Sequence, residues 1–346
     1  MLLNKKNIEF CHSNRIGRDN KGQVTKMRID KLSLVSNFEN PQDEDLIYKK
    51  LDIMDKQKSK RYRVQIIRGI FGKPYTKAIV IKCIAKKSPV LLRIDYKPIN
   101  LKTGSIRFDF NPQYMPPNKM NKLLHWLGKC FSEKLHALLT KSWITRIDVA
   151  YDIYGDKLNN YLWGLTRSEK SKYYDKPNGL PGLLIGSTRS VLHFLCYEKV
   201  DVYGNDRVNK LKKKRLMNID LNECKQFLRI EARIKPKKSL SKTKTNCFLV
   251  NILNIDNPFD RLQIYSSRLK RIIKKTGKNE SYSEILSIVD LKKYILQKNK
   301  SSRLTRKDLD LIRQHQVALL NKAEIWDHWP KCVKRLGVLA QICSDS

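Results

Sequence analysis

Residues 143–153 read Trp-Ile-Thr-Arg-Ile-Asp-Val-Ala-Tyr-Asp-Ile, with apolar and polar side chains in alternation. Such alternation is typical of a β-strand that buries one face, because successive side chains point to opposite sides of a sheet. It places Arg146, Asp148, Ala150 and Asp152 on the same face. The stretch therefore predicts a half-buried strand that carries acids on its polar side.

Two later stretches have the same pattern. Residues 193–199 read His-Phe-Leu-Cys-Tyr-Glu-Lys, and residues 228–234 read Leu-Arg-Ile-Glu-Ala-Arg-Ile. Their shared faces carry His193, Leu195, Tyr197 and Lys199 in the first and Arg229, Glu231 and Arg233 in the second. If the three strands lie in one sheet, acids, a tyrosine and cations converge on one surface. These are the ingredients of metal-assisted attack on a phosphodiester.

The charge of the chain points to a polyanionic partner. Lys and Arg number 71 against 33 Asp and Glu, which gives a net charge of +38 over 346 residues. Such an excess repels itself unless a polyanion neutralises it, so a nucleic acid is the leading partner. A ribosome-associated protein and a membrane-surface binder are the alternatives. The charge is spread along the chain instead of lying on one amphipathic helix, which favours nucleic acid.

The lengths of the apolar runs indicate the cellular compartment of the protein, and the spacing of its cysteines indicates their redox state. No apolar run approaches the roughly 20 residues that a membrane span needs, and residues 1–20 lack the apolar core of a signal peptide. We therefore expect a cytoplasmic protein, in a bacterial host cell, with no membrane partner. The eight cysteines are scattered without a Cys-x-x-Cys pair, which predicts reduced thiols and no zinc site.

The order of elements predicts an α+β fold, with a mainly antiparallel central sheet packed with helices and a helical C-terminal region. We expect a poorly ordered lead-in over residues 1–25, an α+β nicking and origin-binding domain over 26–245 with its catalytic elements in 143–238, and a helical region over 246–346. The expected early strands, punctuated by Gly and Pro, are 27–35, 61–68, 77–84, 90–96 and 105–110.

Helices are expected around and after these strands. A helix candidate lies near residues 43–55, and Asn118 is positioned to cap a helix that runs to about Leu139. A further helix is expected to start near Asp156. The helical candidates of the last hundred residues are 258–275, 283–297, 307–321 and a last helix through Ile342, with Thr305 and Asp308 as a capping box. Periodicity leaves open whether this region is a helix-turn-helix that reads DNA or an interaction domain.

Two loops and a basic linker are candidates for phosphate contact. Residues 168–182 are expected to form a loop, and residues 183–185 and 191–199 a hairpin across Gly-Ser-Thr-Arg-Ser at 186–190. That turn, with Arg189, can hold a phosphate or can be a plain hairpin turn. The charged linker 201–218 contains Lys212, Lys213 and Lys214, which we expect to contact DNA.

A tyrosine nucleophile needs neighbouring groups that help it to lose its phenolic proton. With an ordinary pKa of about 10, Tyr197 is a weak nucleophile at neutral pH, and Lys199 on the same face suits the task of assisting it. Asp148, Asp152 and Glu231 are the candidate ligands of a hard ion, Mg²⁺ or Mn²⁺. Arg146, Arg229 and Arg233 are candidates for DNA contact. The alternatives to these catalytic roles are structural: the charged residues form surface ion pairs, and the tyrosine fills the face of the sheet.

The motifs resemble those of known replication proteins. Residues 145–152 resemble the Arg-x-Asp-x-Ala-x-Asp element of the rolling-circle replication initiation factor (Rep_trans) family. Residues 186–190, followed by Tyr-Glu-Lys at 197–199, look like that family's Gly-Ser-Arg-x-Ser and Tyr-[Asp/Glu]-Lys elements. Residues 227–235 are similar to the Arg-Phe-Glu-Ala-Arg-Ile-Lys stretch of filamentous-phage gene II/X replication nickases.

The resemblance covers about residues 143–238 and implies a nicking tyrosine at Tyr197. It also implies metal ligands at Asp148, Asp152 and Glu231. The chain departs from many plasmid initiators in having Leu195 where they have an arginine, so phosphate binding there must come from elsewhere. The His-apolar-His metal pair of related endonucleases is absent from the sequence, which agrees with carboxylate ligands.

The expected function is that of a replication initiator. It would nick one strand of a phage or plasmid double-strand origin and leave a 5′-phosphotyrosine and a 3′-hydroxyl primer for rolling-circle replication. Expected partners are origin DNA, host helicase and DNA polymerase, and a second subunit in a homodimer. The second nucleophile is open among Tyr197 of that subunit, Tyr154, Tyr203 and water. The alternatives are a conjugative relaxase and a DNA-binding protein without catalysis.

Overall fold

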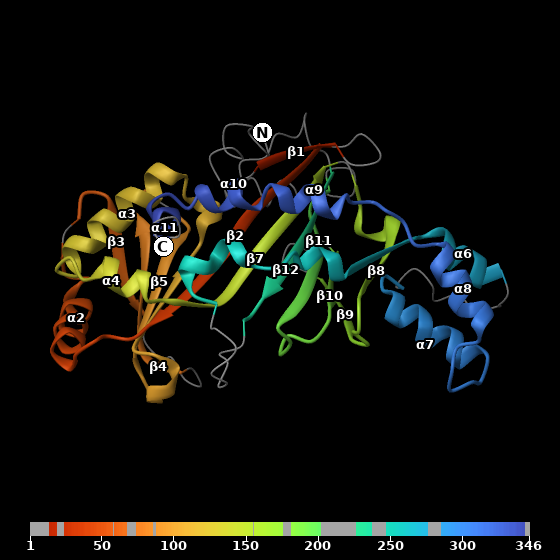
Figure 1. The fold of residues 1–346 in the computed structure, drawn as a ribbon, viewed down its shortest axis with the longest axis horizontal. Helices are drawn as coiled ribbons and strands as arrows, with labels where there is room; N and C mark the ends of the chain where they lie inside the picture. Colours follow the sequence, from red (N-terminus) through yellow and green to blue (C-terminus); the bar gives the residue numbers. More distant parts are fainter. Residues whose placement is uncertain are drawn as a thin grey trace.

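The largest element is an antiparallel sheet in the order β3-β4-β5-β6-β2-β7-β12-β11-β10-β9, with β1 paired to β2 (Figure 1). The structure is a computed structural model that describes residues 14–18, 24–57, 59–67, 74–85, 88–154, 156–175, 181–201, 226–236, 247–275 and 285–342. The strands of this sheet are β1 (Asn14–Arg18), β2 (Val24–Ser36), β3 (Tyr62–Ile67), β4 (Tyr75–Cys83), β5 (Val90–Pro98), β6 (Ile106–Phe110), β7 (Trp143–Tyr154), β9 (Ser171–Asp175), β10 (Pro181–Ile185), β11 (Leu192–Asp201) and β12 (Gln226–Ile234). The fold is α+β with a mainly antiparallel sheet, as the sequence predicts.

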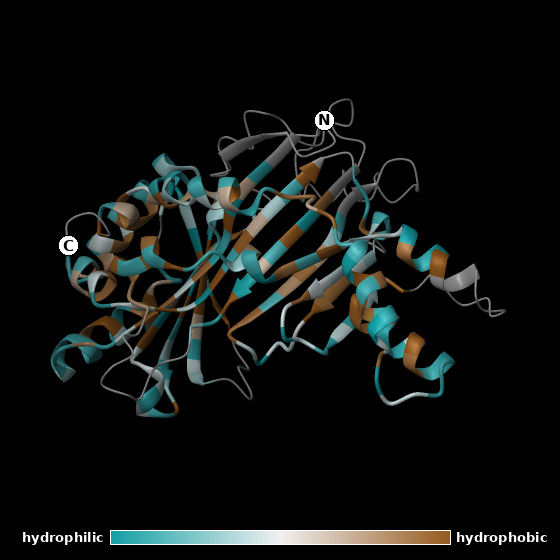
Figure 2. Cartoon of the chain, turned by 45° about the vertical axis from the view of Figure 1, so that its right-hand side comes forward, coloured by the Kyte–Doolittle hydropathy of each residue, from teal (hydrophilic) through white to brown (hydrophobic). Residues whose placement is uncertain are grey.

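The three motif strands are neighbours in this sheet, so the condition for convergence of their polar faces is met. β7 pairs with β12, and β12 pairs with β11. Their registers place Asp148 opposite Arg233 and Tyr197 opposite Arg229. Because the three strands alternate in phase, most of their charged residues share one face and most of their apolar residues share the other; Leu195 and Glu198 are exceptions. Figure 2 shows the hydrophilic and hydrophobic residues alternating along the central strands.

Helices cover the apolar face. A continuous core cluster joins strand residues such as Ile29, Val149 and Ile230 to helix residues such as Leu123 and Leu127. The helices are α2 (Pro41–Ile53), α3 (Pro117–Cys130), α4 (Leu135–Thr140), α6 (Arg268–Lys275), α7 (Ile288–Lys298), α8 (Arg306–Gln314), α9 (Lys322–Asp327), α10 (Trp329–Lys334) and α11 (Val338–Gln341), with short 3-10 turns η3 (Leu158–Asn160), η4 (Leu249–Asn254) and η5 (Pro258–Arg261). Among the helices of the described part, none is long and apolar enough to span a membrane.

The C-terminal helices lie in two places. α9 to α11 return to the main sheet, where the Cys332 thiol contacts the carbonyl oxygen of Met27 at 3.7 Å, and the backbone N–H of Val338 donates to Asn121 Oδ1 at 2.8 Å. α6, α7 and α8 instead pack around a smaller apolar cluster with β8 (Tyr161–Leu165) and β13 (Leu262–Ser266), at one end of the molecule (Figure 1). Residues after 246 therefore complete the main core as well as forming this smaller unit.

Several local predictions were wrong. The expected helix from Asn118 to Leu139 is broken, because Ser132 and Glu133 have positive φ angles of 50° and 62°. The residue before its first turn is Pro116, which makes no side-chain cap, so Asn118 is inside the helix. Strands also occur where a loop, a lead-in or a helix was expected, at β1, β8, β9 and β13.

The errors at β8 and β13 have one physical reason. β8, expected to lie in a helix after Asp156, pairs with β13, which lies about a hundred residues later in the chain. A strand whose partner is that distant leaves little local signal, because its stability comes from the pairing and from burial. The Thr305–Asp308 capping box, in contrast, needs only neighbouring residues, and its prediction is confirmed.

Candidate active site

The predicted nucleophile lies on the charged face of the sheet. The Tyr197 hydroxyl, on β11, donates a 2.9 Å hydrogen bond to Glu231 Oε2 on β12. Tyr197 belongs to neither apolar core cluster, yet it is only 4% exposed. The phenol therefore lies among charged groups but beneath the surface.

Two arginines connect this pair to Asp148. Arg233 Nε donates to Glu231 Oε1 at 2.6 Å and lies 3.6 Å from Asp148 Oδ2. Arg146 binds both oxygens of Asp148, with Nε to Oδ1 at 2.7 Å and Nη2 to Oδ2 at 2.5 Å. These five residues form a continuous network that we call the Tyr197 cluster. Three of the predicted catalytic and metal-binding residues are thus brought together.

Burial and neighbouring charge set the protonation states of the cluster. Burial, reinforced by the Glu231 charge, raises the pKa of Tyr197 well above its ordinary value. Burial alone would raise the pKa of Glu231 as well, but Arg233 outweighs it and holds that pKa below the ordinary value. Burial and the charge of Glu231 raise the pKa of Asp148 to about 6. The phenol is therefore protonated at neutral pH, and Glu231 is ionised and accepts its hydrogen bond.

Asp152 is held in a different network. Arg229 donates to both of its oxygens, from Nε at 2.6 Å and from Nη2 at 3.0 Å, and Arg28 pairs with it from β2. Arg229 Nη1 also donates to Asp30 Oδ1 at 2.8 Å. Arg229 and Asp152 are both completely buried. Arg229, predicted to contact DNA, instead neutralises two carboxylates inside the protein.

The three predicted metal ligands do not form one centre. Within the described ranges, no group of three or more His, Cys, Asp or Glu side chains is arranged to hold a metal ion. Asp148 and Glu231 lie on either side of Arg233, whereas both oxygens of Asp152 bind Arg229. Since Asp152 is saturated by guanidinium donors, these residues do not fit a three-carboxylate site as they are arranged.

The remaining predicted residues lie elsewhere or outside the described part. Arg189 is exposed in the hairpin turn, where its backbone N–H donates to Ser187 Oγ at 3.2 Å. Lys199 belongs to β11, but its side chain is outside what the structure describes, as is the side chain of Tyr154. Lys212, Lys213, Lys214 and Tyr203 lie outside the described residues altogether.

The sequence analysis assigned no role to three residues near the Tyr197 cluster. Tyr174 on β9 packs its ring against Gly182 on β10, where an added Cβ would come within 2.5 Å of the ring. Gly182 in turn lies opposite Tyr197, so the absent side chain leaves room for the Tyr174 ring beside the cluster. His193 and Lys235 lie at the other end of the cluster. Alternation placed His193 on this face, but only the strand register relates it to Arg233.

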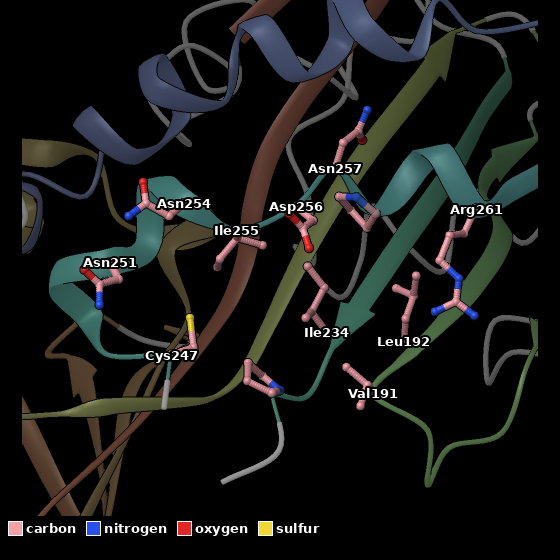
Figure 3. Close-up of a pocket in the computed structure, with 12 residues that line it drawn as sticks. Val191, Leu192, Ile234, Cys247, Asn251, Asn254, Ile255, Asp256, Asn257 and Arg261 are labelled. Atoms are coloured by element: carbon pink, nitrogen blue, oxygen red, sulfur yellow. The ribbon is translucent and has the colours of Figure 1, made fainter. Parts of the chain in front are cut away.

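A separate pocket of about 440 Å³ opens where β11 begins and β12 ends (Figure 3). Its walls include Leu192, Ile234, Asn254 and Arg261. None of the predicted site residues lines it. Leu192 and Ile234 point to the apolar face of the sheet, so the pocket lies across the sheet from the Tyr197 cluster.

Comparison of the sequence with protein-family models and with curated proteins finds no match. The geometry of the charged face and the motifs of its three strands therefore provide the basis for assigning a function.

Proposed function

We propose that this protein is a DNA nickase that initiates rolling-circle replication at a phage or plasmid origin, with Tyr197 as the nucleophile. The observation that carries the proposal is the contact of the Tyr197 hydroxyl with Glu231, inside a cluster that also contains Asp148 and two arginines. The resemblance of the motif strands to the replication initiation factor family supports the same assignment. The net charge of +38 agrees with a DNA substrate.

Glu231 acts in this proposal as the proton acceptor. The phenolic oxygen attacks phosphorus, the bond from phosphorus to the 3′-oxygen breaks, and the phenolic proton passes to Glu231 Oε2. The 3′-oxygen takes a proton from solvent water as it leaves and becomes a hydroxyl. A phenol with a raised pKa does not ionise beforehand, so proton transfer accompanies formation of the new bond, as general base catalysis requires. One phosphodiester replaces another, so the strand can be resealed without a nucleotide cofactor.

The arginines supply charge near the reacting phosphate. The side chains of Arg146 and Arg233 are 23% and 29% exposed, so their guanidinium groups are accessible while each keeps its carboxylate partner. Guanidinium groups bind phosphate oxygens bidentately and stabilise the charge that develops on them. Mg²⁺ or Mn²⁺ stays a prediction from the resemblance, and no step above passes through it.

Access to Tyr197 requires a rearrangement. With 4% of its surface exposed, the phenol cannot meet a phosphodiester until neighbouring side chains on this face move. We propose that binding of the DNA strand supplies the free energy for this local opening. Enzymes commonly use remote binding energy in this way.

The test uses the full chain and single-stranded oligonucleotides of randomised sequence, labelled at the 3′ end, because no origin sequence is assumed. Nicking transfers the labelled 3′ portion to the protein, and the adduct survives denaturing electrophoresis. We expect Tyr197→Phe to lose the adduct, peptide mass spectrometry to locate the phosphotyrosine at Tyr197, and Tyr173→Phe to behave as wild type. An adduct of unchanged yield in Tyr197→Phe would reject the assignment.

The rivals give different outcomes. A conjugative relaxase would form the same adduct but would nick a transfer origin, so supercoiled plasmids carrying either kind of origin separate the two. A DNA-binding protein without catalysis would bind the oligonucleotides and form no adduct under any condition. Host helicase, DNA polymerase and a second subunit are partners of the replication proposal only.

A further inference from the structure

Three cationic side chains lie near a buried histidine beside the Tyr197 cluster. The β11–β12 register places His193 directly opposite Arg233. Lys235 follows β12 by one residue, and its ammonium group donates to the carbonyl oxygen of Thr188 at 2.8 Å. Arg146, Arg233 and Lys235 are each half-buried, so these cationic side chains reach the surface while the imidazole lies below it.

His193 has an unused polar atom. The residue is 1% exposed, and its Nδ1 has no hydrogen-bond partner among the described residues. An unsatisfied buried polar atom is destabilising, and in native proteins such an atom commonly marks a bound ion, a bound water or a functional role. Burial first, and then the charges of Lys235, Arg233 and Arg146, lower the pKa of this imidazole to about 4.

The neighbouring carboxylates leave one cation uncompensated. Asp148 pairs with Arg146, and Glu231 pairs with Arg233. Lys235 forms no ion pair with a carboxylate in the described part of the chain, and burial together with Arg146 and Arg233 lowers its pKa. An anion bound between Lys235 and the two guanidinium groups would relieve this repulsion and accept a hydrogen bond from His193.

We infer that His193, Lys235, Arg146 and Arg233 form a phosphate-binding subsite. His193 lies four residues from Tyr197 on the same strand, a distance of roughly 13 Å, so the subsite borders the Tyr197 cluster and shares Arg146 and Arg233 with it. Only the identification of this anion as a DNA phosphate rests on the proposed function. Many plasmid initiators have an arginine where this chain has Leu195. Arg233 on the adjoining strand β12, together with Lys235 just after it, would supply phosphate contact in place of that arginine.

The direct test is a titration with inorganic phosphate. In protein labelled with ¹⁵N-histidine, His193→Gln assigns the His193 imidazole signal. We expect phosphate to shift that signal in wild-type protein and Lys235→Gln to weaken the apparent affinity three- to tenfold. Lys49→Gln, which removes an exposed charge from α2, serves as the matched control. Thermal unfolding of each variant establishes that it is folded.

A second measurement follows binding of a short oligothymidine at several salt concentrations. Loss of one phosphate contact reduces the slope of log affinity against log salt by about 0.7 for a single strand. We expect Lys235→Gln to lower the slope by that amount and Lys49→Gln to leave it unchanged. A His193 imidazole signal that does not shift when phosphate is added would overturn the inference. Equal slopes of log affinity against log salt in the two variants would also overturn it. Loss of the covalent adduct in Tyr197→Phe is measured in a separate assay. If the nicking proposal fails, the phosphate titration still tests the subsite.

Discussion

Tyr197 and Glu231, 34 residues apart in the chain, share a 2.9 Å hydrogen bond because β11 and β12 are adjacent strands. Glu231 lies opposite Leu195, two residues before Tyr197, so the bond runs diagonally between the strands. Diagonal neighbours lie within reach of long side chains. The phenol of Tyr197 and the carboxylate of Glu231 therefore meet across the two strands.

The first prediction concerns the stability that this bond provides. Tyr197→Phe leaves a buried Glu231 oxygen with one donor fewer, so we expect the free energy of unfolding to fall by about 1–2 kcal/mol. Urea unfolding of the protein without DNA measures the change. Tyr62→Phe is the control, because Tyr62 is another buried strand tyrosine and lies outside the Tyr197 cluster. Equal stability of the two variants would show that the Tyr197 bond does not persist in solution.

The second prediction concerns the buried network around Arg229. Replacing this residue by Met leaves Asp30 and Asp152 with fewer cationic partners inside the protein. We expect Arg229→Met to lose about 3–5 kcal/mol of unfolding free energy, as measured by denaturant unfolding. Arg313→Ala, which removes an exposed pair with Asp310, should cost less than about 1 kcal/mol. A mild effect at Arg229 would mean that its guanidinium is not desolvated.

The third prediction concerns pH. The folded protein holds the Asp148 proton more tightly than the unfolded chain does, since the pKa rises from 3.8 to about 6 on folding. The stabilising contribution is complete below pH 4 and is lost as the pH rises through 6, by up to about 3 kcal/mol. We expect the difference in unfolding free energy between wild type and Asp148→Asn to change over this window. A difference that stays constant from pH 4 to pH 7 contradicts the raised pKa.

The fourth prediction concerns the divalent ion. If the resemblance extends to the metal, EDTA abolishes adduct formation and added Mn²⁺ restores it. Glu231→Gln should then weaken Mn²⁺ binding, measured by electron paramagnetic resonance, while oligonucleotide binding at matched salt persists. Cleavage that survives chelation would leave charge stabilisation to Arg146 and Arg233 alone. In that case Glu231→Gln still abolishes the adduct, because its role as proton acceptor is independent of the ion.

The sequence predicts the charged face well because alternation and strand order are local properties. The sequences around Asp148, Tyr197 and Glu231 have the alternation that predicts strands. These residues come together because the three strands are adjacent in the sheet. The separation of Asp152 could not be predicted, because it depends on Arg28 and Asp30 from β2, which lies more than a hundred residues earlier. β8 and β13 were missed for the same reason. Their hydrogen bonds exist only after distant parts of the chain have met.

The contact between Cys332 and Met27 spans 305 residues, and α10 packs on β2 at that point. Translation adds about 5–20 residues per second, so β2 emerges roughly 15–60 s before the helix that covers it. Throughout that interval the apolar surface that α10 later covers is exposed. Overproduction should therefore depend on chaperone capacity, and a lower growth temperature should increase the yield of native protein.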